Sequence, residues 1–214
     1  MATLAASPLP KPADPGPDRS RQLVDAAYDL LAEDGLEGLT IRAVLKRTGL
    51  ARRAFYERFA GKDDLVLAVF EQTLVEAARL FRELGELLPS PVERLQMLVT
   101  NIALARASPD IADADRRTAA LSREHLRLAE ARPVELQSAL APLLDLIAEI
   151  VAEGTAQGQF RPCDPALQST LIYNLVSTTV HTEFIVGDPA ARDPARRQAL
   201  ADEIWEFCRR ALAA

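Results

Sequence analysis

The sequence predicts an all-α protein, with an N-terminal three-helix domain that contains a helix-turn-helix and a C-terminal helical bundle. Apolar residues recur with a period of about 3.6 residues along most of the chain after residue 20. No stretch alternates between apolar and polar residues as a series of β-strands would. Glycines and prolines separate the periodic segments. A repeat of fixed length and a Gly-rich phosphate loop are both missing.

The helices can be placed in order along the chain. Residues 1–17 contain five prolines and no periodicity, so we expect a disordered tail. Gly35 occupies the position of a helix C-cap, and Thr40 is a favourable N-cap. Thr48-Gly49-Leu50 interrupts the chain between two short helices, which together predict a helix-turn-helix. The predicted helices cover approximately residues 20–34, 41–47, 52–58, 63–87, 91–106, 116–131, 140–153, 165–186 and 195–213.

Composition excludes several classes of protein. The chain has 214 residues, 49% of them hydrophobic, which is enough for one or two domains with a real core. No apolar run reaches the roughly 18 residues of a membrane span, and a signal-peptide pattern is missing, so we expect a cytoplasmic protein. Cys163 and Cys208 lack metal-ligand spacing. With only His125 and His181 as histidines, we expect neither an enzyme, nor a cofactor, nor a metal site.

Charge is distributed unevenly along the chain. The segment from Thr40 to Lys62 contains seven basic residues and one acidic residue, Glu57, for a local charge of +6. The remainder, with 18 basic and 30 acidic residues, carries −12. An acidic body with one compact basic segment suits a protein that binds a polyanion through that segment. Taken alone, the charge pattern would favour a solvated basic face.

Residues 21–65 resemble the N-terminal DNA-binding domain of the tetracycline-repressor (TetR) family. The resemblance is carried, at the family's spacing, by Ala26-Ala27, Gly35, Thr40, Thr48-Gly49-Leu50, Phe55-Tyr56, Phe59, Lys62 and Leu65. The rest of the chain is similar in style only, with Gly158-Gln159-Phe160 ahead of Asp164-Pro165. The resemblance implies a DNA-binding domain over 18–62 and an effector-binding and dimerisation domain over 63–214.

The candidate DNA contacts lie in the basic segment. Leu50, Phe55 and Phe59 are spaced to face inward, and the side chains between them are expected to face outward. Arginine can pair bidentately with guanine, and the methyl of Ala54 can contact thymine. The resemblance adds Arg42 as a base contact and Thr40, Tyr56 and Lys62 as phosphate contacts; a packing role for Tyr56 and a plain surface charge for Lys62 remain alternatives. The expected set is Thr40, Arg42, Arg52, Arg53, Ala54, Tyr56, Arg58 and Lys62.

Two positions depart from the family's pattern. Ala51 stands where a small hydroxyl residue usually caps the recognition helix, and Ala54 often has a threonine counterpart. One cap and one hydroxyl contact are therefore lost. Arg52 and Arg53 can compensate through their charge, which favours phosphate affinity over base discrimination.

The effector site and the dimer interface are expected in the C-terminal region. Residues 91–159 contain no Phe, Tyr or Trp, which predicts a mainly aliphatic pocket. Its candidate residues are Phe70, Met97, Asn101, Arg106, His125, Tyr173 and Asn174, each of which could instead be a core or surface residue. The last two helices have more apolar surface than one packing partner would cover. The expected interface is Leu175, Phe184, Ile204, Trp205, Phe207 and Cys208, with packing inside one subunit as the alternative.

We therefore expect a homodimeric transcriptional regulator, a repressor that a small apolar or amphipathic effector releases from a palindromic operator in double-stranded DNA. It would have no membrane partner. One alternative is a non-specific DNA-binding protein of the same fold without an effector. An α-helical enzyme is disfavoured because no paired His or carboxylate motif recurs at i,i+3 or i,i+4 on two helices. For Cys163, an unactivated thiol is expected in preference to a redox-active one.

Overall fold

The computed structural model describes residues 17–104, 121, 124–186 and 193–214, and these residues form helices and short connections. The predicted all-α fold is confirmed. Within the described ranges the only β-type pairing is an isolated bridge between Phe160 and Ala213. None of the described helices is long and apolar enough to cross a membrane. The helices are α1 (Pro17–Gly38), α2 (Ile41–Thr48), α3 (Arg52–Tyr56), α4 (Lys62–Gly85), α5 (Pro91–Ala103), α7 (Pro133–Ala156), α8 (Pro165–Val186) and α9 (Pro194–Leu212).

Helix α1 is longer at both ends than the predicted 20–34, but it is interrupted at Gly35, and α2 begins at Ile41, both as the sequence predicts. Gly35, with a φ of 67°, breaks the helical geometry near the end of α1. Thr40 caps α2, because its Oγ1 accepts a hydrogen bond of 3.1 Å from the Ala43 N–H. Gly49 closes α2 in the left-handed conformation, with a φ of 68°, and its N–H bonds the Leu45 carbonyl at 3.0 Å.

Helix α3 is shorter than the two turns predicted over 52–58. It ends at Tyr56, and the Arg58 and Phe59 N–H groups both donate to the Phe55 carbonyl at 2.9 Å. This turn replaces the second helical turn. Ala51 precedes α3 without a side-chain cap, as its lack of a hydroxyl predicts. The second helix of this helix-turn-helix is therefore short, and the buried ring of Phe55 fixes it to the core.

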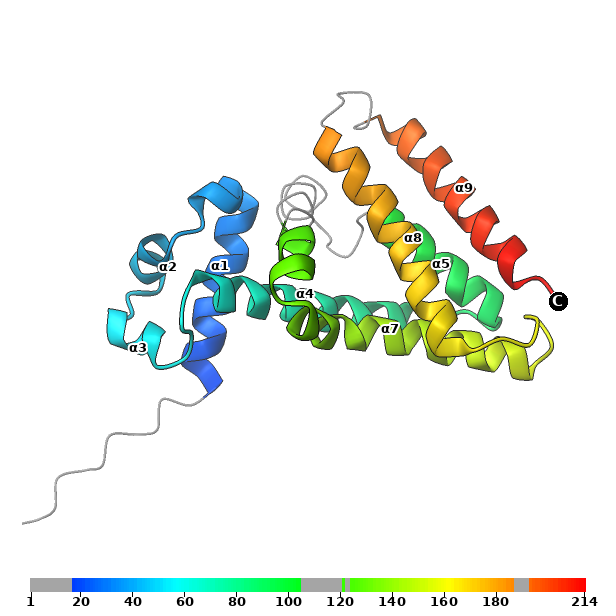
Figure 1. The fold of residues 1–214 in the computed structure, drawn as a ribbon, viewed down its shortest axis with the longest axis horizontal. Helices are drawn as coiled ribbons and strands as arrows, with labels where there is room; N and C mark the ends of the chain where they lie inside the picture. Colours follow the sequence, from blue (N-terminus) through cyan, green and yellow to red (C-terminus); the bar gives the residue numbers. More distant parts are fainter. Residues whose placement is uncertain (1–16, 105–120, 122–123, 187–192) are drawn as a thin grey trace, which may run out of the picture.

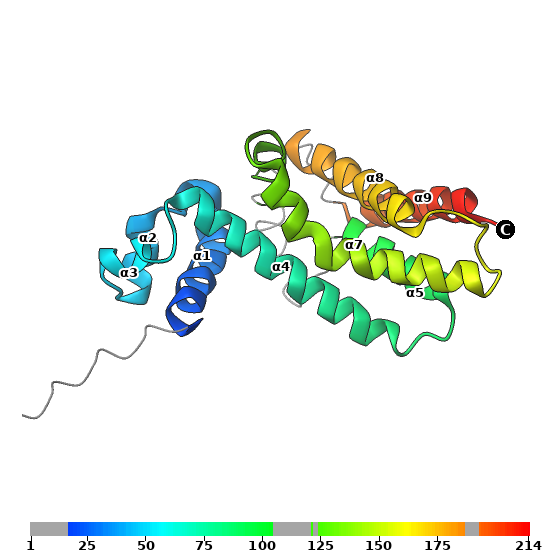
Figure 2. The ribbon, with the colours of Figure 1, turned by 60° about the horizontal axis from the view of Figure 1, so that its bottom comes forward.

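Helix α4 connects the two ends of the molecule (Figure 1). Its first turns lie beside α1, and the rest of the helix runs along α7. Helix α8 packs on α7, and α5 packs on α9 (Figure 2). One continuous apolar core extends through both ends, from Leu23 of α1 to Leu212 of α9. A movement of α4 would consequently change the packing of both the N-terminal helices and the bundle.

The middle of the chain differs from the prediction in two details. Of the helix expected over 116–131, residues 121 and 124–131 are described and helical, and the remainder lies outside the described residues. The next helix was expected around residue 140 but begins at Pro133, since a proline at the first helical position lacks only an N–H that would be unpaired anyway. Proline therefore opens α7 here, directly after the break at Arg132.

The turn between α7 and α8 is fixed by Phe160. Gly158 adopts a φ of 70°, and the Phe160 ring, almost fully buried, lies over α7. A Cβ on Gly154 would approach that ring to 2.2 Å, so only glycine fits beneath it. The Arg161 N–H bonds the Leu212 carbonyl at 3.0 Å, which joins this turn to the end of α9.

Candidate functional site

The exposed side of α3 presents a paired arginine and tyrosine. The Arg52 guanidinium lies 5.4 Å from the centroid of the Tyr56 ring, and its Nη2 is 3.3 Å from the Tyr56 hydroxyl oxygen. The ring is 47% exposed, while Phe55 beside it is fully buried. Arginine stacked in this way is held in one orientation with its remaining N–H groups directed outward. The pair is thus arranged for contact with a polyanion.

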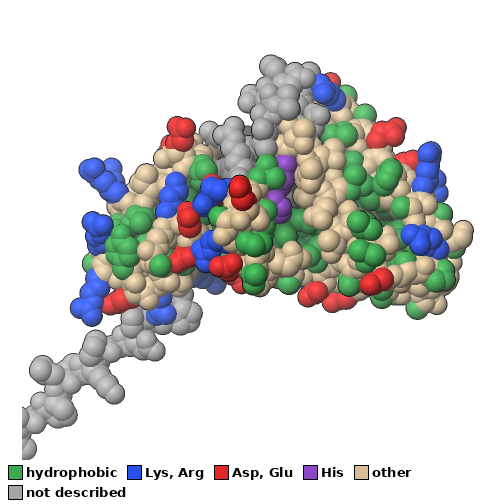
Figure 3. Space-filling model, in the orientation of Figure 1, with side chains coloured by type: hydrophobic (Ala, Val, Ile, Leu, Met, Phe, Trp, Pro, Cys, Tyr) green, Lys and Arg blue, Asp and Glu red, His purple; other side chains and the backbone are tan. Residues whose placement is uncertain are grey.

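A second arginine lies on the adjacent side of α3. The Arg53 Nε donates to Glu57 at 2.8 Å, and the Arg53 side chain is 90% exposed. An ion pair this exposed contributes little to stability, so Arg53 is free to exchange Glu57 for a phosphate. Arg42, Lys46 and Arg58 are also exposed. Figure 3 shows lysine and arginine side chains projecting at the end of the molecule that α1–α3 form.

The structure contradicts the outward orientation predicted for Ala54. This residue is only 8% exposed, because α3 has its buried side at Ala54 and Phe55 together. The prediction treated every residue between the inward-facing positions as exposed, although neighbours at 100° on a helix share a face. Phe55 and Phe59 do face inward as predicted, and Leu50 is half-buried.

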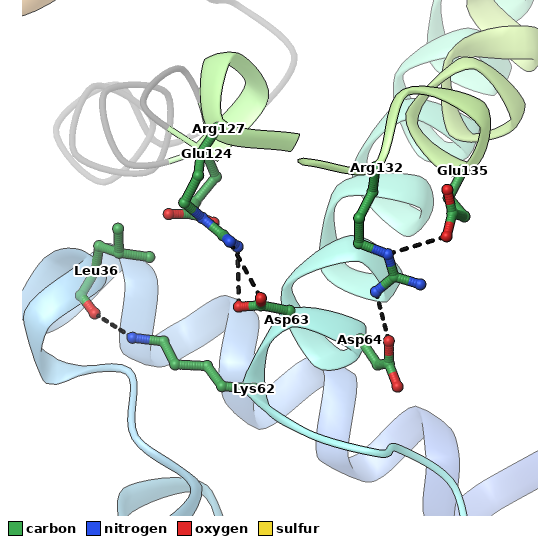
Figure 4. Close-up of polar contacts among 8 residues, drawn as sticks. All are labelled: Leu36, Lys62, Asp63, Asp64, Glu124, Arg127, Arg132 and Glu135. Atoms are coloured by element: carbon green, nitrogen blue, oxygen red, sulfur yellow. Dashed lines mark hydrogen bonds and ion pairs between the residues drawn. The ribbon is translucent and has the colours of Figure 1, made fainter. Parts of the chain in front are cut away.

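Two of the predicted phosphate contacts also have structural roles. Thr40 is exposed and caps α2 through its hydroxyl oxygen, which leaves the hydroxyl proton available as a donor. The Lys62 ammonium donates to the Leu36 carbonyl at 3.1 Å and so joins the start of α4 to the end of α1 (Figure 4). An ammonium has three donors, so this bond leaves others for a second acceptor.

Two arginines bind the first turn of α4 from the other side. Arg127 donates to Asp63 at 2.9 and 3.1 Å and to Glu124 at 2.7 Å, and Arg132 bonds Asp64 (Figure 4). Arg132 and the Ala60 N–H hold the pKa of Asp64 below its usual value. Glu124 is buried, and together with Asp63 and Asp64 it gives the two arginines a group of charge-assisted hydrogen bonds at the start of α4. We name these contacts the junction ion pairs.

Arg132 also contacts the first turn of α7, the helix that follows it. Its Nε donates to Glu135 at 3.1 Å, and that bond, after one from the backbone, lowers the pKa of Glu135. The guanidinium therefore bridges α4 and α7 (Figure 4). Sequence reasoning did not identify the junction ion pairs, because Asp63 and Arg127 are 64 residues apart and no periodic pattern connects them.

A cluster of four rings occupies the bundle above the junction. The His125 ring lies 5.7 Å from Phe70, 6.2 Å from Tyr173 and 5.0 Å from His181, centroid to centroid. These rings come from α4, the helical segment 124–131 and α8. We name Phe70, His125, Tyr173 and His181 the ring cluster. Three of its members were predicted effector residues; His181 was not.

The other predicted effector residues are not in the ring cluster. Met97 packs next to Gly85, near the end of α4. Gly85 lies about 22 Å along this helix from Phe70, at a rise of 1.5 Å per residue. Asn101 donates its amide to the Met97 carbonyl at 2.8 Å. Asn174 is exposed, because it lies on the side of α8 away from the core, and its prediction as a pocket residue is wrong. Arg106 lies outside the described residues.

The predicted dimer helices have both buried and exposed apolar residues. Ile204, Trp205 and Cys208 are at most 8% exposed within the single chain, since this side of α9 packs on α5, so they offer no free surface to a partner. Their assignment to an interface is wrong. Phe207 is 64% exposed, and Leu175 is half-buried. The Phe184 side chain lies outside what the structure describes.

Helix α8 exposes a stripe without charge. Up to Thr182, where the described side chains of α8 end, its exposed positions are Ala166, Leu167, Leu171, Asn174, Thr178 and Thr182. Leu167 and Leu171 are each 53% exposed. None of these exposed positions carries a charge, which is unusual for the surface of a long helix that faces only water. Leu167 and Leu171 in this stripe, together with Phe207, are the exposed large apolar side chains of α8 and α9.

The cysteines carry no feature of a reactive site. Cys208 is buried, and burial raises the pKa of its thiol to about 11. Cys163 is half-buried, with its Sγ 3.8 Å from the Thr155 hydroxyl oxygen. Within the described ranges no three His, Cys, Asp or Glu side chains are grouped so that they could hold a metal ion.

The sequence and the fold were compared with known proteins. Residues 23–69 match the family described as bacterial regulatory proteins, tetR family. The fatty acid metabolism regulator protein of Bacillus subtilis (strain 168) is 22% identical over 169 residues, which cover 78% of this chain and 84% of that protein. The fatty acid degradation regulator FadR from Bacillus halodurans has a similar structure, with a TM-score of 0.67 at 20% identity, covering 90% of this chain and 98% of its own.

A further structure of the same fold contains a ligand. The transcriptional regulator FadR from Bacillus subtilis, in complex with stearoyl-CoA, has a TM-score of 0.59 at 18% identity. The match covers 88% of this chain and 96% of that one. The helix-turn-helix and the bundle behind it thus have counterparts along nearly the whole chain.

Proposed function

We propose that this chain is a DNA-binding transcriptional regulator of the TetR family, whose model matches residues 23–69, and that it is a homodimeric repressor that an acyl-chain effector releases from its operator. The observation that supports this most directly is the exposed basic side of α2 and α3, which contrasts with an acidic remainder of the chain. The same contrast favours approach to DNA by one end only. The proposed domains are 18–62 for DNA binding and 63–214 for effector binding and dimerisation.

The proposed DNA contacts follow the geometry of α3. The exposed arginine beside the tyrosine ring, Arg52, would contact a base edge, and Arg53 would exchange its contact with Glu57 for phosphate or base. Thr40, Tyr56 and Lys62 would contact phosphates, with Arg42 and Arg58 adding positive charge or base contacts. Ala54 is left out of the proposed interface because it is buried.

Dimerisation would place two α3 helices in successive major grooves. The uncharged stripe of α8 and the exposed ring of Phe207 form the surface that we propose for the partner subunit. A two-fold symmetric contact places equivalent recognition helices about 34 Å apart on a palindromic site. The protein would act where the chromosome is, in the cytoplasm.

An acyl chain is the proposed effector class for two reasons. From residue 91 to 159 the chain contains no Phe, Tyr or Trp, and the buried residues of α5 and α7 are mainly Leu, Ile, Val and Ala. Such a lining gains from apolar contact rather than from stacking. In addition, the relatives of similar fold include a regulator of fatty acid metabolism and one in complex with stearoyl-CoA.

The junction ion pairs are the proposed connection between the effector and DNA. Asp63 and Asp64 lie in the first turn of α4, which Lys62 joins to α1. Arg127 lies two residues after His125, a member of the ring cluster. An effector that displaces segment 124–131 would therefore alter the bonds that orient the first turn of α4. The first turn of α4 would thus have two orientations, one with and one without the effector. The effector can shift the equilibrium between them only by the difference between its binding free energies for the two.

Footprinting on the promoter of the gene itself, followed by release assays, tests the proposal. A discrete palindromic footprint, released by decanoyl-CoA at lower concentration than by the planar cation rhodamine 6G, is the expected result. Diffuse protection without a preferred site would instead support the non-specific DNA-binding alternative. Preferential release by the planar cation would refute the acyl-chain effector and leave the DNA-binding assignment intact.

A further inference from the structure

The ring cluster contains polar atoms that the rest of the fold does not use. Nδ1 of His125 and both ring nitrogens of His181 are buried and have no hydrogen-bond partner among the described residues. Both side chains are nevertheless half-buried rather than fully enclosed. Histidine side chains are visible at the surface in Figure 3. These three nitrogens are therefore the parts of the two rings that are turned away from solvent.

Buried polar atoms of this kind normally have a partner. A neutral imidazole carries one N–H donor and one acceptor nitrogen, and leaving either of them buried and unpaired is unfavourable. The large majority of buried polar groups in proteins are hydrogen-bonded. Three unpaired nitrogens on two neighbouring rings therefore need an explanation. Apolar side chains would be the stable choice at these positions if they served only packing.

We infer that His125 and His181 form the polar end of the effector site and hydrogen-bond an uncharged carbonyl or hydroxyl oxygen on an otherwise apolar ligand. This inference rests on the proposed function, because it assigns the head group of the same effector. Phe70 and Tyr173 provide the apolar surfaces on either side of His125, with centroid distances of 5.7 and 6.2 Å. The Tyr173 hydroxyl is engaged by Ser177 on its own helix, which leaves the imidazoles as the donors.

The charge state of the pair selects an uncharged head group. Burial lowers the pKa of both histidines, and that of His181 falls to about 4 because His125 would also repel its charge. At neutral pH the two rings are therefore neutral. Arg127, the basic residue of the described segment 124–131, is already bound to Glu124 and Asp63, so it is not available to balance a carboxylate at the pair. A thioester or ketone carbonyl fits a neutral N–H donor.

The position of the pair also connects the head group to the junction ion pairs. His125 and Arg127 belong to the same helical segment, so a bond to the His125 ring acts on the segment that binds Asp63. His181 belongs to α8, which packs on α7. A ligand oxygen held by both rings would thereby fix segment 124–131 relative to α8. A purely apolar ligand would lack this contact.

The chain has only two histidines, which makes a direct test possible. In protein labelled with ¹⁵N-histidine, every imidazole signal belongs to His125 or His181. Addition of 2-octanone should shift the nitrogen signals of at least one ring, and n-octane should shift them much less. The His125→Phe and His181→Phe variants should each bind 2-octanone about 10-fold more weakly, as expected for one lost hydrogen bond. Leu126→Ala, an exposed neighbour, is the matched control and should bind normally.

The outcomes separate this inference from the proposed function. Unchanged imidazole signals on ketone binding, or equal ketone affinity in wild type and both phenylalanine variants, would overturn the inference alone. A response to stoichiometric Zn²⁺ with none to 2-octanone would also overturn it. Failure of both decanoyl-CoA and 2-octanone to release the protein from its operator would contradict the acyl-chain effector of the proposed function itself. Wild-type spectra keep the test valid even if a variant fails to fold.

Discussion

If the chain is the repressor proposed above, loss of Arg132 should make it easier to release from its operator. In the structure its guanidinium bonds Asp64 in the first turn of α4 and Glu135 at the start of α7 (Figure 4). If this arrangement belongs to the DNA-binding orientation, the Arg132→Gln change removes a bond that favours that orientation. Decanoyl-CoA should then release the operator at lower concentration, while affinity for DNA without effector changes little.

The size of the effect follows from the exposure of the pair. The Arg132 and Asp64 side chains are 27% and 31% exposed, so solvent screens the pair only in part. A fully exposed pair contributes less than about 1 kcal/mol, and a hydrogen bond to a charged group about 1.5–3 kcal/mol. We take about 1–2 kcal/mol, which corresponds to a 5- to 30-fold lower decanoyl-CoA concentration at half-release. Asp64→Asn should have a similar effect, and the double variant no more than either alone.

Fluorescence anisotropy of a labelled operator, titrated with decanoyl-CoA, measures this concentration. Arg82→Gln is the matched control, because Arg82 also joins α4 to α7, through Glu149 at 2.9 Å, about 30 Å along α4 from its first turn. If Arg82→Gln lowers the half-release concentration as much as Arg132→Gln, the junction has no special role. A higher half-release concentration in Arg132→Gln would show that the pair belongs to the released orientation and refute the reasoning.

Lys62→Ala should weaken binding to every DNA sequence and lower the salt slope by about one unit per phosphate, whereas Arg52→Ala should cost about 1–3 kcal/mol per half-site and relax one base preference. Equal loss of specific and non-specific affinity in both variants would refute these roles. Phe207→Glu should give folded monomers in sedimentation, while a charge at buried Ile204 should destabilise the fold; a wild-type monomer at micromolar concentration would exclude the proposed interface. Because the pKa of His181 is about 4 in the folded chain against 6.5 unfolded, the unfolded state binds more protons between these values, and stability should fall as the pH drops through that window. Urea titrations at pH 7 and 4.5 should differ by about 2 kcal/mol, less than the full shift gives because the ring is partly exposed, and His181→Phe should reduce the difference.

The helix-turn-helix could be predicted closely because local chemistry determines it. Thr40 and Gly49 act within one or two turns of their own positions, so their capping roles follow from residue type and spacing. The inward position of Phe55 follows from helical periodicity in the same way. The length of α3 did not follow, because the turn that ends it depends on two backbone N–H groups sharing the Phe55 carbonyl.

The C-terminal sites depend on which helix faces which, and that is not a local property. The apolar residues of α9 were assigned to a partner subunit, whereas Trp205 and its neighbours pack on α5. Periodicity identifies an apolar side but not what covers it. The ring cluster likewise unites Phe70 and His181, over a hundred residues apart. His181 carries no sequence signal beyond being one of two histidines, and only its position beside His125 distinguishes it.

Because α4 is one uninterrupted helix, it can transmit and enlarge a displacement from the bundle to the N-terminal helices. Its 24 residues extend about 36 Å without a break, with Phe70 about 22 Å and Lys62 about 34 Å from the Gly85 end. Rotation about that far end multiplies a sideways displacement at Phe70 by about 1.5 at Lys62, and the helices α1–α3 beyond it move farther. In a symmetric dimer both arms swing, so the separation of the two α3 helices changes by the combined displacement. A shift near 1 Å at the rings would then become several ångströms at the grooves, whose spacing DNA holds constant.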